Sequence, residues 1–167
     1  MKYTIIAGTN RNGSNTLKVA KQYQDMLIAR GIQVQLVSLE GIDLNEKGSY
    51  LSKLEEDVFI PTDKFIFILP EYNGSYPGSL KTMIDMTEIR KVWWGKKALL
   101  IGVSTGRAGN LRGMDHLTGA LNYLKVTVHH NKLPISSVDK LLNEAGVIAD
   151  TTTLKAMEHQ VEEFLAF

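Results

Sequence analysis

Apolar runs and helical patterns alternate along this chain. Three runs are almost continuously apolar, at residues 3–7, 65–69 and 98–103. Strands that helices cover on both faces have this composition, so these runs predict central strands of a parallel sheet. Two other runs, residues 32–36 and 126–129, carry a polar residue at every second position. Such alternation indicates one wetter face, which favours a place at the edge of the sheet.

Between these runs, apolar residues recur at the three- and four-residue spacing of amphipathic helices. A short further helix is expected within Tyr50–Val58, and Asp150 or Thr151 is the expected N-cap of the last helix. Residues 133–149 are predicted only as a long connection. The four clear helical faces lie within residues 19–27, 80–87, 114–124 and 154–164.

The order of central and edge strands predicts the topology. With the first, third and fourth strands central and the second and fifth at the edges, the arrangement matches the doubly wound order 2-1-3-4-5. The sequence therefore predicts an α/β fold, a flavodoxin-like three-layer sandwich with a five-stranded parallel sheet. A chain of 167 residues is expected to form a single domain over residues 1–167.

Composition narrows the function classes. The net charge is +1 and the basic residues are scattered, which argues against nucleic-acid binding. The absence of cysteine excludes disulfides, thiol catalysis and cysteine-ligated metals. The sequence shows neither a leader nor a membrane-length apolar run, so a cytoplasmic protein with no membrane association is expected. The four histidines show no ligand spacing, and no metal site is predicted.

The loop from Gly8 to Thr16 joins the first strand to the first helix. The unpaired N–H groups at a helix start, the loop hydroxyls and the charge of Arg11 together suit a phosphate. The spacing of Gly8 and Gly13 imitates a P-loop, but Ser14 stands where that motif needs lysine. The loop therefore suits a phosphomonoester better than a nucleoside triphosphate.

Two more loops are predicted to converge on this one, because ligands bind where the strand order reverses. The loop at residues 70–78 holds two prolines, two glycines, Tyr72, Tyr76 and Asn73, which suit a planar polar ring. Backbone donors in residues 104–113 can meet the carbonyl side of that ring and stabilise negative charge when it is reduced. A phosphate and a planar ring in one ligand fit flavin mononucleotide (FMN).

The same loops resemble a known family. Residues 70–81 read P-E-Y-N-G-S-Y-P-G-S-L-K, close to the P-E-Y-N-G-S-x-P-G-x-L-K of the NADPH-dependent FMN reductases, which include quinone, azo and chromate reductases. The first loop resembles the family's G-S-x-R-x-x-S-x-N, with Thr9 and Thr16 in place of serine and asparagine. The third resembles S-x-G-G-x-G-G, with Arg107 in place of a small residue.

The resemblance covers most of the chain and implies a flavodoxin-like fold with bound FMN. It also implies NAD(P)H as electron donor and a homodimer or homotetramer with the flavin near the interface. It assigns the FMN phosphate to Thr9, Arg11, Ser14, Asn15 and Thr16. It assigns the isoalloxazine to Pro70, Glu71, Tyr72, Asn73 and Gly74, with Ser104, Thr105, Gly106 and Arg107 on its other edge.

The implied activity is hydride transfer from NAD(P)H to FMN and on to a quinone, azo, flavin or metal-oxyanion acceptor. No conventional catalytic residue is expected, because the cofactor carries the chemistry. Two alternatives remain open, a flavodoxin-like electron carrier without nicotinamide activity and a flavin-free binding module. The +1 charge weakens the first, since carriers of that kind are usually strongly acidic. For Trp93 and Trp94, a place in the core or at a subunit interface is favoured over the alternative of stacking on the flavin.

Overall fold

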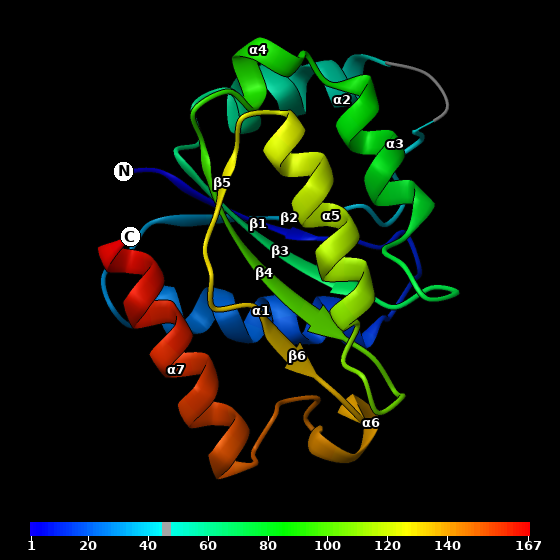
Figure 1. The fold of residues 1–167 in the computed structure, drawn as a ribbon, viewed down its shortest axis with the longest axis vertical. Helices are drawn as coiled ribbons and strands as arrows, with labels where there is room; N and C mark the ends of the chain where they lie inside the picture. Colours follow the sequence, from blue (N-terminus) through cyan, green and yellow to red (C-terminus); the bar gives the residue numbers. More distant parts are fainter. Residues whose placement is uncertain (45–47) are drawn as a thin grey trace.

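A parallel sheet forms the centre of the molecule (Figure 1). The computed structural model describes residues 1–44 and 48–167. The order β2-β1-β3-β4-β5 confirms the predicted topology, and a further strand, β6, also pairs with β4. The strands are β1 (Tyr3–Ala7), β2 (Val34–Ser38), β3 (Lys64–Pro70), β4 (Lys97–Val103), β5 (Thr127–Val128) and β6 (Leu133–Ile135).

The fifth position of the sheet is filled by two short strands. β5 pairs with the start of β4, at Lys97 and Ala98, whereas β6 pairs with its end, at residues 101–103. The described sheet therefore has six strands in five positions, where five strands are predicted from the sequence. Pro134 is tolerated in β6 because an edge strand can lack one N–H donor. The predicted connection thus contains a strand that completes the sheet.

Helices cover both faces of the sheet, which gives the predicted three layers and a flavodoxin-like fold (Figure 1). α1 and α7 pack on one face, and α3 and α5 pack on the other. Asp150 is the N-cap of α7, where its carboxylate accepts from the Thr153 N–H at 2.7 Å. The helices are α1 (Asn15–Ile28), α2 (Ser49–Leu54), the π-helix η1 (Glu55–Phe59), α3 (Gly78–Met86), α4 (Ile89–Val92), α5 (Leu111–Tyr123), α6 (Val138–Leu141) and α7 (Thr151–Ala166).

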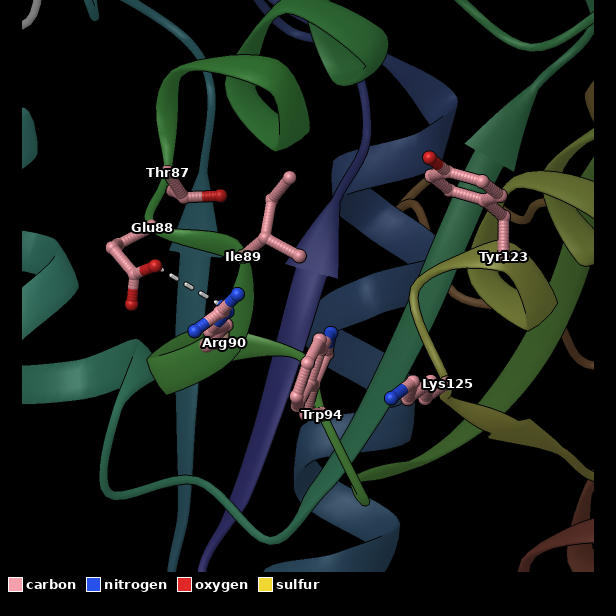
Figure 2. A pocket seen from close by; sticks show the side chains of 7 residues that line it. All are labelled: Thr87, Glu88, Ile89, Arg90, Trp94, Tyr123 and Lys125. Atoms are coloured by element: carbon pink, nitrogen blue, oxygen red, sulfur yellow. Dashed lines mark hydrogen bonds between the residues drawn. The ribbon is translucent and has the colours of Figure 1, made fainter.

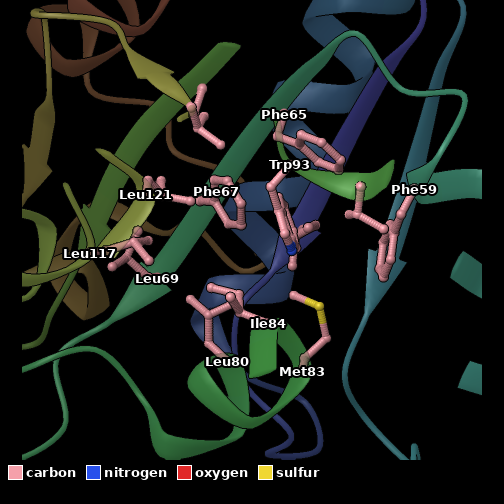
Figure 3. Close-up of a cluster of buried hydrophobic side chains, with 14 of the residues drawn as sticks. Phe59, Phe65, Phe67, Leu69, Leu80, Met83, Ile84, Trp93, Leu117 and Leu121 are labelled. Carbon is pink, nitrogen blue, oxygen red and sulfur yellow. The ribbon is translucent and has the colours of Figure 1, made fainter. Parts of the chain in front are cut away.

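An aromatic cluster dominates the core on the α3 and α5 face (Figure 3). The Trp93 ring lies 4.9 Å from Phe65 and 6.3 Å from Phe59, measured between ring centroids. Its indole N–H donates to the hydroxyl of Thr87 at 2.9 Å, so its single polar atom is satisfied in the interior. Trp93 is fully buried, which confirms the predicted core position, whereas Trp94 is 40% exposed. Among the described residues, no helix is long and apolar enough to cross a membrane.

Candidate functional site

The loops after β1, β3 and β4 meet beyond the carboxyl ends of the strands. Two adjoining cavities of about 180 and 440 Å³ lie among them and share Glu71, Ser104 and Thr105 as lining residues. Arg11 and the start of α1 line the smaller cavity, and Asn73 and Arg107 line the larger one. The arrangement is one elongated site with a smaller end at the start of α1 and a wider end, and each end has one arginine in its lining.

The smaller end is built on the start of α1. The Ser14 hydroxyl caps this helix by accepting from the Leu17 N–H at 3.1 Å. Asn15 and Thr16 are the first two helical residues, so their N–H groups have no carbonyl four residues back within the helix. Gly13 makes the preceding turn at a φ of +61°. Helix N–H groups and the exposed Arg11 therefore offer an anion several donors.

Side chains tie the first loop to the second. The Thr9 hydroxyl lies 2.6 Å from the Tyr72 hydroxyl and accepts from the Arg11 N–H at 3.2 Å. The Arg11 guanidinium lies over the Tyr72 ring, 4.0 Å from its centroid, a cation–π contact. The phosphate-type loop and the hairpin that follows β3 are thus held together by this three-residue unit.

A tight hairpin follows β3. Tyr72 and Ser75 exchange both backbone hydrogen bonds, at 2.9 and 3.1 Å, around Asn73 and Gly74. The φ angles of Asn73 and Gly74 are +52° and +77°, so the pair forms the Asn-Gly turn that two-residue hairpins favour. Asn73 and Gly74 both line the larger cavity. Burial raises the pKa of Tyr76, which follows this turn.

Asn110 joins the second loop to the third, and the sequence analysis missed it. The side chain is fully buried, and its Nδ2 donates to the carbonyls of Leu69 at 3.1 Å and Pro70 at 2.8 Å. Asn110 has a φ of +61°, a region that asparagine enters more readily than most residues. A Cβ at Gly113 would lie 2.1 Å from Oδ1 of Asn110, so only glycine fits there. An asparagine directly before a helix was the signal available in the sequence.

The segment formed by β6 and α6 supports the third loop. Ser104 donates its N–H to Ile135 and accepts from the Val138 N–H, both at 3.0 Å. Ser137 donates to the Gly106 carbonyl at 3.0 Å. Through these bonds, residues 135–138, which lie within the predicted long connection, support the loop that follows β4.

Most of the predicted site residues gather at the two cavities. Thr9 and Ser14 do not line either cavity, because Thr9 is buried against Tyr72 and Ser14 caps α1. The predicted residues that do line them are Arg11, Asn15, Thr16, Pro70, Glu71, Tyr72, Asn73, Gly74, Ser104, Thr105, Gly106 and Arg107. The unpredicted lining residues are Val103, Ala108 and Val138.

A larger groove of about 610 Å³ lies elsewhere (Figure 2). The Trp94 ring lies 5.2 Å from the guanidinium of Arg90 and 3.6 Å from the ammonium of Lys125. The Glu88 carboxylate caps α4 and accepts from the Arg90 N–H at 3.3 Å. None of the three loops that follow the central strands lines this groove, so volume alone does not locate the site. Its lining residues are Thr87, Glu88, Ile89, Arg90, Trp94, Tyr123 and Lys125.

The fold and these loops define a flavodoxin-like α/β protein with its crevice at the switch point of the sheet. Residues 1–140 match the model of the NADPH-dependent FMN reductase family, so the chain belongs to this family of oxidoreductases. The family uses FMN and NAD(P)H.

Relatives of known name span nearly the whole chain. It is 28% identical over 172 residues to an NAD(P)H-dependent FMN reductase of Pseudomonas aeruginosa, covering 97% of this chain and 92% of the relative. It is 28% identical over 176 residues to a 2-hydroxy-1,4-benzoquinone reductase of a Burkholderia species, covering 100% and 96%. Its fold resembles the flavoenzyme NAD(P)H:(acceptor) oxidoreductase of Paracoccus denitrificans, with a TM-score of 0.80 at 22% identity over 99% and 95% of the chains.

Proposed function

We propose that this protein is an FMN-dependent NAD(P)H oxidoreductase that delivers electrons to a small-molecule acceptor of the quinone, azo, flavin or metal-oxyanion type. One observation carries the proposal. A helix start suited to an anion and an Asn-Gly hairpin border two adjoining cavities that share Glu71, Ser104 and Thr105. Membership of an FMN reductase family supports the same conclusion.

The residues present fit FMN. The phosphate belongs at the start of α1, where Arg11 supplies charge and the N–H groups of Asn15 and Thr16 supply donors. Thr9 and Ser14 hold this loop in shape. The isoalloxazine belongs in the larger cavity, with Glu71, Asn73 and Gly74 on one side and residues 104–107 on the other. Pro70 and Tyr72 line the adjoining smaller cavity.

The residues of the chain bind FMN, orient its ring and stabilise charge on it. When bound, FMN supplies the redox chemistry, taking up hydride from NAD(P)H and releasing electrons to the acceptor. Backbone N–H groups around Asn73 and Gly106 can donate to the polar edge of the ring and stabilise negative charge there. The Thr9–Tyr72 and Asn110–Pro70 contacts fix the loops before any ligand arrives, which lowers the ordering cost of binding.

The proposal extends to the setting of the activity. Residues 1–167 act as one FMN-binding domain in a cytoplasmic homodimer or homotetramer, as the resemblance implies. No nucleic-acid or membrane partner is proposed, and the scattered charge of the chain supports the first exclusion.

An anaerobic titration tests the proposal. We expect purified protein loaded with FMN to show a flavin absorbance band that bleaches on addition of NADPH and returns when a quinone is added. A yellow protein that NADPH does not bleach would favour the electron carrier, and a protein that takes up no FMN would sink both. Asn73→Ala is expected to weaken FMN binding or shift the flavin potential, whereas unchanged affinity and turnover would remove Asn73 from the site.

A further inference from the structure

Three of the four histidines of the chain gather around one carboxylate. His129 and His130 directly follow β5, and Glu163 and His159 lie one turn apart on α7. One ring nitrogen each from His129 and His130 and one carboxylate oxygen of Glu163 lie within 4.8 Å of one another. The Nε2 atom of His159 lies 3.4 Å from Oε1 of Glu163. We propose that this cluster is a binding site for a divalent transition-metal ion of the Zn²⁺ class.

The donor set defines the class of ion. Imidazole nitrogens with one carboxylate suit Zn²⁺, Ni²⁺ and Cu²⁺, whereas Mg²⁺ and Ca²⁺ prefer oxygen ligands alone. Ligands at about 2.1 Å from a tetrahedral Zn²⁺ lie about 3.4 Å from one another. The ligand atoms lie within 4.8 Å of one another, so closing the cluster around an ion requires side-chain rotation, and His130 is the exposed member of the set.

The cluster is partly preorganised. His129 is 2% exposed, and its ring packs edge-on against Phe167 at 4.9 Å between centroids. Asn131 donates its side-chain N–H to Oε2 of Glu163 at 2.6 Å, and the buried Gln160 holds Asn131 by donating to its carbonyl at 2.7 Å. Contacts of this kind orient ligating carboxylates in metal sites.

The local charge also permits a cation. Glu163 supplies a negative charge, and the hydrogen bond from Asn131 lowers the pKa of its carboxyl. The ammonium of Lys64 keeps its positive charge, but its hydrogen bonds go to the carbonyls of Phe164 at 2.8 Å and Leu165 at 3.1 Å, so it does not occupy the Glu163 carboxylate. The backbone N–H of Asn131 donates to Nδ1 of His129 at 3.3 Å. A metal ion bound at the lone pair of this nitrogen would displace that one long hydrogen bond.

Such an ion would link the chain after β5 to the last helix, two segments about 30 residues apart in sequence. None of the four residues lines either cavity of the flavin site. The metal site is therefore independent of the proposed activity and would act as a staple at the C-terminal helix. Binding to the folded state alone raises stability with ion concentration.

The test uses the full chain without a histidine tag, stripped with a chelator and kept free of added flavin. Zn²⁺ is titrated by calorimetry, and Co²⁺ is added as a visible-absorption probe of tetrahedral coordination. We expect one Zn²⁺ per chain, tetrahedral Co²⁺ bands, and a thermal midpoint that rises with Zn²⁺ but not with Mg²⁺. Failure to take up stoichiometric Zn²⁺ would overturn the proposal and leave the flavin function untouched.

Matched variants assign the ligands. His130→Ala and Glu163→Gln should each lower Zn²⁺ affinity at least about tenfold, because they remove a ligand from the ion. His116→Ala is the control, since it removes the one histidine that lies outside the cluster, on α5, and should leave affinity unchanged. Circular dichroism of the metal-free variants checks that each one folds. Equal affinity in the His130 and His116 variants would place the ion elsewhere and overturn the assignment.

Discussion

The two ends of the sheet carry hollows of opposite character. The groove at Trp94 is the larger, about 610 Å³, and presents an indole between two cationic side chains. The two cavities at the carboxyl ends of the strands are smaller, but their loops donate to one another through Thr9, Tyr72 and Asn110. The walls of the smaller hollows are therefore joined by contacts between loops, whereas the Trp94 groove lies among the ends of α3, α4 and α5.

The difference teaches that contacts between loops, and not volume, distinguish the candidate site. Positive φ angles do not separate the two hollows, because Asn73 and Gly74 line the larger cavity and Lys125, at a φ of +59°, lines the Trp94 groove. The comparison yields four predictions, from the largest expected effect to the smallest.

Asn110→Asp should have the largest effect. It keeps the shape and left-handed tendency of the residue but points a carboxylate at the carbonyls of Leu69 and Pro70. A buried, unpaired charge costs on the order of 3 kcal/mol, so urea unfolding at neutral pH should show a loss of about that size and FMN affinity should fall.

The pH dependence identifies the cause. Burial raises the pKa of the introduced carboxyl in the folded state above its unfolded value, so stability and FMN affinity should recover as pH falls and the acid becomes a donor. Asn110→Gly is the matched control, because it keeps the backbone conformation, loses the donors and carries no titrating group. A variant as stable as the parent at neutral pH would show that Asn110 is not a clamp.

Arg11→Gln and Arg90→Gln compare the two ends directly. A hydrogen bond to a charged group contributes about 1.5–3 kcal/mol, so Arg11→Gln should weaken FMN binding roughly tenfold to a hundredfold. Riboflavin, which lacks the phosphate, should bind both variants about equally. Flavin fluorescence titration measures both ligands. Should Arg90→Gln have the stronger effect on FMN, the site would lie at the Trp94 groove instead.

Two glycines of α5 separate close packing from helix propensity. A Cβ at Gly113 would lie 2.1 Å from Oδ1 of Asn110, whereas nothing lies within 4 Å of a Cβ at Gly119. We expect Gly113→Ala to destabilise by roughly 1–3 kcal/mol and Gly119→Ala to stabilise by up to about 1 kcal/mol. Denaturant unfolding reads out both, and similar shifts of one sign would contradict the tight contact at Asn110.

Asp150, the N-cap of α7, lies in neither hollow and provides a reference for the comparison. Hydrogen bonds from the Thr153 hydroxyl and N–H lower the pKa of this cap below its ordinary value of 3.8. Its contribution is therefore complete above that value and is lost as the pH falls through the lower folded-state pKa. The thermal midpoint of Asp150→Asn, a cap that does not titrate, should fall less between neutral pH and about pH 3 than that of the parent. Identical acid profiles would remove this cap from the acid response.

Much of the fold follows from local patterns. The three apolar runs predicted as central strands cover nearly the whole length of β1, β3 and β4. The alternation at residues 32–36 predicts an edge strand, which the structure places at residues 34–38. β6 escaped prediction because it has three residues, one of them Pro134, and forms only by pairing with β4. A strand that short has no periodicity of its own.

The candidate site also has residues that local motifs predict and residues that they do not. Motif residues such as Arg11 and Asn73 are visible because their loops follow apolar strands. Asn110 was not, because its partners lie about 40 residues away and only the folded chain brings them together. The same holds for the histidine cluster, because only the folded chain brings His129 and His130 next to Glu163 of α7.

The backbone hydrogen bonds from the β6 and α6 segment affect how the larger cavity can open. Ser104 and Gly106 are tethered to Ile135, Ser137 and Val138, so the ring-side wall and the margin of the sheet belong to one cooperative unit. A bulky acceptor that needs a wider cavity entrance must therefore also break the hydrogen bonds to the β6 and α6 segment. Amide exchange at Ser104 and Val138 should then occur in concert, as rare large openings in place of frequent small ones.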